Sequence, residues 1–116
     1  MSSATEASAA SNEPRHDDLV DERLVRWWFY VGLLYLGVSM SGGILMALQL
    51  IHWNPISGIE LFSPGRWRMV HTNAVAYGFI ASSFLGVLEW TVPRLTMQRV
   101  LSRKLSYFIF FAWQVV

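Results

Sequence analysis

The stretch WWFYVGLLYLGVSMSGGILMALQLI, residues 27–51, contains no charged residue and is long enough to cross a lipid bilayer. About 30 Å of hydrocarbon needs about 20 helical residues, because each residue adds about 1.5 Å. Trp27 and Trp28 stand at one end of the stretch and Trp53 just beyond the other, as is usual for aromatic side chains at the lipid headgroups. The stretch therefore predicts a transmembrane helix.

A second apolar stretch begins at Ser63 and Pro64, which have the pattern of a helix N-cap followed by proline at the first helical position. Pro93 is expected to end this helix, because proline cannot donate the backbone hydrogen bond that a helix interior requires. A third apolar stretch starts at Leu105 and reaches the last residue after about 18 Å of helix, too short to cross a bilayer. The predicted helices are about 27–51, 64–91 and 105–116, the third cut in mid-helix.

The composition supports an all-α integral membrane protein, with two complete spans and the start of a third in a transmembrane helix bundle. The chain is 53% hydrophobic and 15% aromatic, with a mean hydropathy of +0.35, which is too apolar for a soluble domain of this size. A net charge of +1 gives no indication of nucleic-acid binding. The absence of cysteine excludes disulfides, thiolate metal sites and covalently attached c-type haem.

Residues 1–26 differ in kind, since they are rich first in Ser and Ala and then in mixed charge. They are predicted to form a disordered polar tail before a membrane domain over 27–116. The loop over 94–104 carries four basic residues, whereas the start of the second helix carries two. The positive-inside rule then places this loop and the N-terminus in the cytoplasm.

The stretch GRWRMVHTNAV, residues 65–75, places two arginines and a histidine in the first turns of the second helix. An ionisable side chain inside a membrane helix is costly and usually functional. His71 is a candidate ligand of a haem iron, since imidazole is a common axial ligand. Arg68 lies three residues earlier on the same helix face. Arg68 and Arg66 are candidate partners of the haem propionates, because guanidinium pairs well with carboxylate.

Small residues recur along both helices at a spacing of four. They allow a flat cofactor or another helix to approach closely. The two rows are Ala74, Gly78, Ser82, Gly86 and Ser39, Gly43, Ala47. Such rows more often serve plain helix packing than a cofactor. A lone histidine near the interface can simply be hydrated, and the two arginines can extend to the headgroups. The residues alone leave both interpretations open.

The stretch 65–75 resembles the second-helix signature of subunit I of the haem–copper oxidases. It is most like that of the cbb3-type (C-family) cytochrome c oxidases, where a Gly-Arg-x-Arg-x-x-His-Thr-Asn-Ala pattern is typical. The resemblance extends over residues 32–49 and along the second helix to about Arg94. It implies a subunit of about twelve helices, of which this chain is the N-terminal part, in a bacterial inner membrane.

The resemblance implies that His71 is one of two axial ligands of a low-spin haem b, with Arg68 on the propionate side. It assigns no catalytic residue to this chain. The second axial ligand and the ligands of a high-spin haem and copper lie on later helices, and His52 and His16 match none of them. The implied enzyme is a cytochrome c oxidase that reduces oxygen to water and moves protons across the membrane. Its partners are the rest of subunit I and a cytochrome c-type subunit, and the chain alone is not sufficient for catalysis.

Two alternatives remain at this stage. The large subunit of nitric oxide reductase also carries a His-Thr-Asn in this place, and the first two helices do not distinguish it. A small non-catalytic membrane protein, packing in a larger complex, is an alternative of another class. Among nearby polar residues, Thr72 or Asn73 can orient a ring nitrogen of His71, or Thr72 can bond back to its own helix. Glu89 is either a proton-uptake carboxylate or an interface residue.

Overall fold

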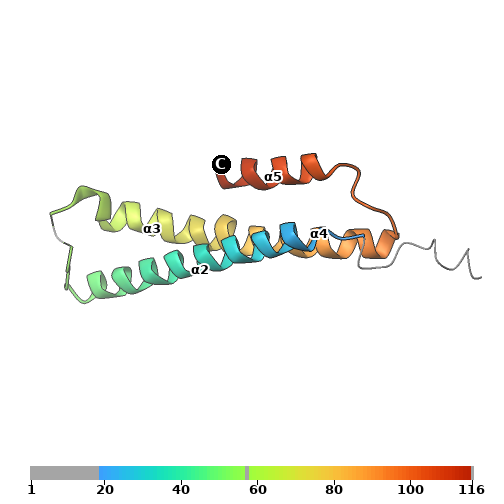
Figure 1. Cartoon of the computed structure of the whole chain (residues 1–116). Coiled ribbons are helices and arrows are strands. Elements are labelled where there is room, and N and C mark those ends of the chain that lie inside the picture. Colours follow the sequence, from blue (N-terminus) through green and yellow to red (C-terminus); the bar gives the residue numbers. More distant parts are fainter. Residues whose placement is uncertain (1–18, 57, 116) are drawn as a thin grey trace, which may run out of the picture.

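The computed structural model describes residues 19–56 and 58–115, and the part it describes is built from helices. Two long antiparallel rods lie side by side, and a shorter helix runs along the half of the pair that holds the start of the first rod (Figure 1). This half is called the inner half below and the other the outer half, as labels only. The predicted all-α membrane architecture is confirmed. In chain order the elements are α2 (Glu22–Leu50), the 3-10 turn η2 (Glu60–Phe62), α3 (Pro64–Asn73), the π-helix η3 (Ala74–Ala81), α4 (Ser82–Thr96) and α5 (Arg103–Val115).

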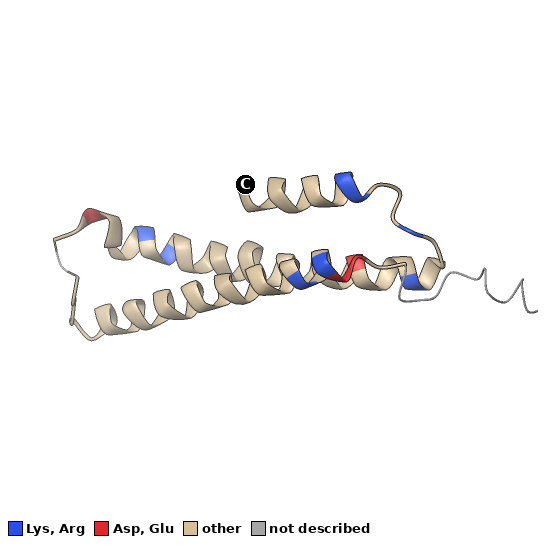
Figure 2. Cartoon of the chain, in the orientation of Figure 1, with Lys and Arg blue, Asp and Glu red and all other residues tan. Residues whose placement is uncertain are grey.

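Both rods are long and apolar enough to cross a membrane. The first is α2, with a mean hydropathy of 1.8 over its most apolar window, and the second is the continuous run of α3, η3 and α4, with 1.4. Large apolar side chains along them face outward, including Leu34 at 66% and Ile44 at 61% exposure. Lys and Arg gather near the helix ends (Figure 2). Such a surface suits lipid or further helices and would not be stable in water.

The first helix begins at Glu22 rather than at about residue 27, so the predicted boundary of the polar tail at residue 26 is wrong. Asp21 is the cause, because its side chain accepts a hydrogen bond from the backbone N–H of Leu24 at 3.4 Å and caps the helix. Leu24 and Val25 are buried in the first turns. Residues 1–18 of the predicted tail lie outside the described residues.

The second rod continues to Thr96, so the predicted end at about residue 91 is also wrong. Pro93 lies inside α4 and is buried. A proline removes one backbone donor, which leaves one carbonyl in the preceding turn without its usual partner, and transmembrane helices tolerate this loss. The helix ends at Met97 instead, whose φ of 52° is left-handed, a common way for a helix to stop.

Small residues of the second rod receive aromatic side chains of α2. A β-carbon at Gly78 would collide with the ring of Tyr35, and one at Gly86 would lie 2.9 Å from Cβ of Trp28. Ser82, between these glycines, is fully buried. The row of small residues over 74–86 is therefore a helix-packing surface, one of the two interpretations that the sequence left open.

The third helix packs against the inner half of this pair. Phe110 of α5 meets Trp28 edge to face, with ring centroids 4.8 Å apart, and Leu24 completes the buried cluster. The indole nitrogen of Trp113 donates to the carbonyl oxygen of Tyr77 in η3 at 3.3 Å. The predicted start of this helix near residue 105 is close to the observed Arg103.

Candidate functional site

His71 lies in the last turn of α3, immediately before the π-helical segment, and its ring faces α2. Nδ1 of His71 is 2.7 Å from the carbonyl oxygen of Ser39 and 3.0 Å from its Oγ. The Ser39 hydroxyl donates in return to the carbonyl oxygen of His71 at 3.3 Å. Ser39 is 1% exposed. The two rods are therefore joined at this level by polar contacts in both directions.

These contacts determine which ring nitrogen carries the proton. A carbonyl oxygen can only accept, so a distance of 2.7 Å from the Ser39 carbonyl requires Nδ1 of His71 to be the donor. In a neutral imidazole with the proton on Nδ1, Nε2 keeps its lone pair. Histidines that bind metals are commonly held in this way, with one nitrogen donating to a carbonyl and the other free for the metal.

The close approach of the ring depends on two adjacent glycines of α2, Gly42 and Gly43, called the glycine pair below. A β-carbon at Gly43 would lie 3.2 Å from Cε1 of His71, and one at Gly42 would lie 3.5 Å from Cβ of His71. A β-carbon at Gly43 would therefore press on the imidazole as it lies against the Ser39 carbonyl, whereas one at Gly42 would make an ordinary contact. The small-residue row of α2 thus includes the surface against which the imidazole lies.

Trp67 stands one turn before His71 on the same helix face. Its indole nitrogen is buried and has no hydrogen-bond partner among the described residues. This nitrogen lies near the glycine pair, since a β-carbon at Gly42 would be 3.5 Å from it. Buried donors are nearly always paired, and this N–H is covered by α2 at the contact between the two rods.

The two arginines have different surroundings. Nη2 of Arg66 pairs with Oε1 of Glu60 at 3.1 Å, and both side chains are largely exposed, at 60% and 84%. Arg68 is exposed, and within residues 19–56 and 58–115 no ion pair or hydrogen bond holds its guanidinium. Arg66 would have to leave Glu60 to bind another carboxylate, whereas Arg68 would not.

The polar neighbours of His71 do not orient its ring. Oγ1 of Thr72 donates back to the carbonyl of Arg68 at 2.9 Å, as the second of the two sequence interpretations expected. Asn73 is exposed and lines a groove of about 770 Å³ on the side of α5. Sequence reasoning missed that Ser39, thirty-two positions away, supplies the acceptor. The sequence signal that could have indicated this role is that Ser39 belongs to the same row of small residues as Gly43.

The helix geometry changes directly after this site. Residues Ala74–Ala81 are π-helical, a rare conformation that often occurs at functional sites. Within it the carbonyl of Tyr77 receives bonds from Trp113 and, at 3.5 Å, from Oγ of Ser82. The π-helical segment that follows His71 is thereby linked to α5.

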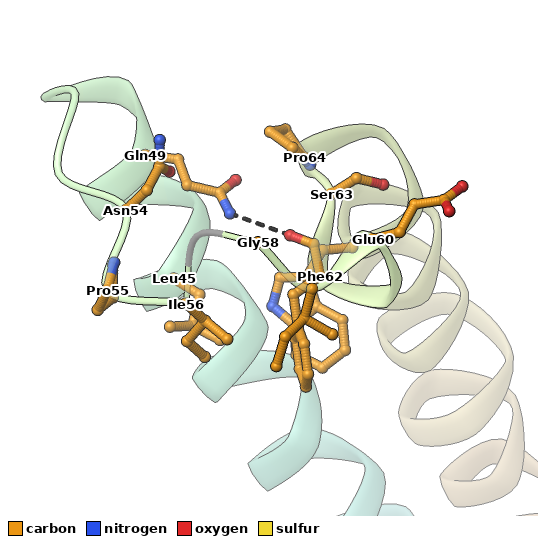
Figure 3. Close-up of a pocket in the computed structure, with 12 residues that line it drawn as sticks. Leu45, Gln49, Asn54, Pro55, Ile56, Gly58, Glu60, Phe62, Ser63 and Pro64 are labelled. Carbon is orange, nitrogen blue, oxygen red and sulfur yellow. Dashed lines mark hydrogen bonds between the residues drawn. The ribbon is translucent and has the colours of Figure 1, made fainter.

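The connection between the rods closes over the outer end of the site. Nε2 of Gln49 donates to the carbonyl of Phe62 at 3.4 Å, and the Phe62 ring packs against Trp67 with centroids 5.2 Å apart. Figure 3 shows these residues around a pocket of about 420 Å³. His52 lies in this connection, exposed and with a φ of 62°, away from His71. His16 lies outside the described residues.

These features define a multi-pass helical membrane protein whose second span presents a histidine with one free ring nitrogen. Residues 23–116 match the family "Cytochrome C and Quinol oxidase polypeptide I". The chain belongs to this family, subunit I of the haem–copper oxidases, and it resembles part of a cbb3-type member, as its signature predicted.

One curated relative is the cbb3-type cytochrome c oxidase subunit CcoN1 of Stutzerimonas stutzeri. The two are 31% identical over 96 residues, which cover 81% of this chain and 20% of the relative. The chain therefore spans about a fifth of the length of that protein. No solved structure matches the chain.

Proposed function

We propose that this chain is the N-terminal part of the catalytic subunit of a cbb3-type cytochrome c oxidase, and that Nε2 of His71 is an axial ligand of its low-spin haem b. The single observation that supports the proposal is the 2.7 Å contact of Nδ1 with the Ser39 carbonyl, because a neutral imidazole that donates from Nδ1 keeps the lone pair of Nε2 for a metal.

The residues around His71 fit a haem. A β-carbon at Gly43 would lie 3.2 Å from Cε1 of His71, so the absence of a side chain there gives the imidazole its room beside α2. Arg68 is the proposed main cation for the propionates, because Arg66 would have to release Glu60 first.

A bound haem would supply one-electron transfer. His71 would hold its iron through Nε2, and the Ser39 carbonyl would hold the imidazole through Nδ1. In the described residues no three His, Cys, Asp or Glu side chains cluster as a metal site. The second axial ligand and the ligands of a high-spin haem and copper are proposed to lie on the rest of subunit I.

The whole enzyme is proposed to reduce oxygen to water with electrons from a cytochrome c-type partner and to move protons across a bacterial inner membrane. The basic residues between the end of α4 and the start of α5, and Arg23 and Arg26 in the first turns of α2, support a cytoplasmic N-terminus. His71, near the start of the second span, then lies toward the outer face, the side from which the electron donor is proposed to act.

The test is His71→Ala in the assembled oxidase, read as the reduced-minus-oxidised spectrum and the haem content per subunit. We expect the low-spin haem b band to disappear. His52→Asn is the matched control, because Asn tolerates the left-handed backbone of that position, and it should keep the band. An intact low-spin band in His71→Ala would contradict the proposal. Rates of oxygen and nitric oxide consumption by the wild-type enzyme would distinguish an oxidase from a nitric oxide reductase.

A further inference from the structure

The imidazole of His71 is positioned by the backbone of another helix. Its acceptor is a carbonyl oxygen in the middle of α2, where side chains normally keep other groups at a distance. The ring reaches this oxygen because Gly42 and Gly43 follow Ser39 on the same side of the helix. The hydrogen bond from His71 to the Ser39 carbonyl therefore depends on the glycines beside it.

We propose that the glycine pair is a positioning element that sets the ring plane of His71 and the length of its Nδ1–H bond to Ser39, and thereby tunes the redox potential of the low-spin haem. The proposal rests on the proposed role of His71 as a haem ligand. Gly43 is the more sensitive position, because its missing β-carbon would lie 3.2 Å from Cε1, whereas the one at Gly42 would have an ordinary contact at 3.5 Å.

The chemistry follows from the hydrogen bond. A donor bond from Nδ1 to a carbonyl increases the electron-donating power of Nε2 and holds the ring in one orientation. A stronger donor favours the ferric over the ferrous iron, so the short bond lowers the midpoint potential. A β-carbon at Gly43 would displace the ring by a few tenths of an ångström, weaken this bond and raise the potential.

The experiment compares three Gly→Ala variants of α2 in the assembled oxidase. Gly43→Ala and Gly42→Ala change the surface beneath His71, while Gly37→Ala adds a methyl group where no atom lies within 4 Å. Each substitution increases helix propensity in the same way, so this contribution cancels in the comparison. The readouts are the midpoint potential of the low-spin haem and the g-values of its ferric EPR signal, which report ring orientation.

We expect an upward shift of the potential and altered g-values in Gly43→Ala, and values close to the wild type in Gly42→Ala and Gly37→Ala, because only the β-carbon at Gly43 would press on the ring. Equal values in Gly43→Ala and Gly37→Ala, with haem content retained, would overturn the inference. If Gly43→Ala does not assemble, Gly42→Val decides, because its branched side chain extends beyond the 3.5 Å contact of a β-carbon: a potential identical to that of Gly37→Val overturns it. A low-spin haem that persists in His71→Ala instead overturns the proposed function.

Discussion

The two rods meet in two places that use small residues in opposite ways. Along the inner part of the pair, the small residues belong to the second rod and receive Tyr35 and Trp28 from α2. At the outer part they belong to α2 and receive His71 from α3. The first contact is formed by aromatic rings against glycine backbone and the second includes hydrogen bonds in both directions. Small residues therefore allow the approach, and the inserted side chain determines what the contact does.

The largest effect is expected at the inner contact. Gly78→Ala places a β-carbon in the ring of Tyr35, and overpacking of this kind costs about 1–3 kcal/mol. We expect less assembled subunit in the membrane and a lower unfolding temperature. Gly65→Ala, where no atom lies within 4 Å, is the control. A Gly78→Ala subunit as stable as Gly65→Ala would show that the two rods do not pack here as described.

The outer contact is expected to respond to Ser39→Ala. This change removes a buried hydroxyl that lies 3.0 Å from Nδ1 and donates to the His71 carbonyl, a loss of about 1 kcal/mol. Because the bond from Nδ1 to the backbone carbonyl remains, haem should be retained but lost more readily on mild heating.

The matched control for this prediction is Ser41→Ala. Ser41 is exposed and bonds only to the carbonyl of Gly37 in its own helix, at 2.9 Å. Haem dissociation is measured by transfer to an apoprotein acceptor. If Ser41→Ala accelerates haem loss as much as Ser39→Ala, the buried serine has no particular role in holding His71.

Much of this comparison could be predicted from the sequence, because it depends on periodicity. The spans, the spacing of small residues, and the position of His71 with Arg68 all follow from residue order. The acceptor for His71 could not be predicted, since a backbone carbonyl has no residue identity and its exposure depends on the absence of neighbouring β-carbons. The position of Trp67 could not be predicted for the same reason, because its indole nitrogen lies against the backbone of Gly42.

The helix ends were predicted less well, for reasons that are local. Asp21 starts α2 early through a single capping bond at 3.4 Å, in a segment whose charge suggested disorder. Pro93 was expected to stop a helix, but transmembrane helices tolerate one missing donor, because neighbouring groups and local adjustments of the helix can satisfy the carbonyl that it leaves free. Composition indicates which segments are apolar and does not locate the individual bonds that start or end them.

A smaller effect is expected from the arginines. Arg68→Gln removes a cation that we propose lies near the haem propionates, so the reduced haem, which carries one more electron, loses stabilisation and the midpoint potential should fall. Arg66→Gln should shift it less, because Arg66 is paired with Glu60. The measurement is a redox titration of both variants, and a fall in Arg66→Gln that exceeds the fall in Arg68→Gln would reverse the assignment.

The smallest effect is expected from Glu60→Gln. The pair it breaks is 60% and 84% exposed, and such pairs contribute about 0–1 kcal/mol. The unfolding temperature should stay within experimental error of the wild type and depend little on salt. A marked destabilisation would mean that this pair anchors the connection over the outer end of the site.

The central claim is that the His71 ring occupies one axial position of the low-spin haem. The most direct measurement uses His71→Gly, which leaves a space the size of an imidazole between the glycine pair and α3, in the assembled oxidase supplied with haem and free imidazole. The account predicts no low-spin haem b spectrum without imidazole and its return as imidazole is added. A spectrum unaffected by His71→Gly, with or without imidazole, would contradict it.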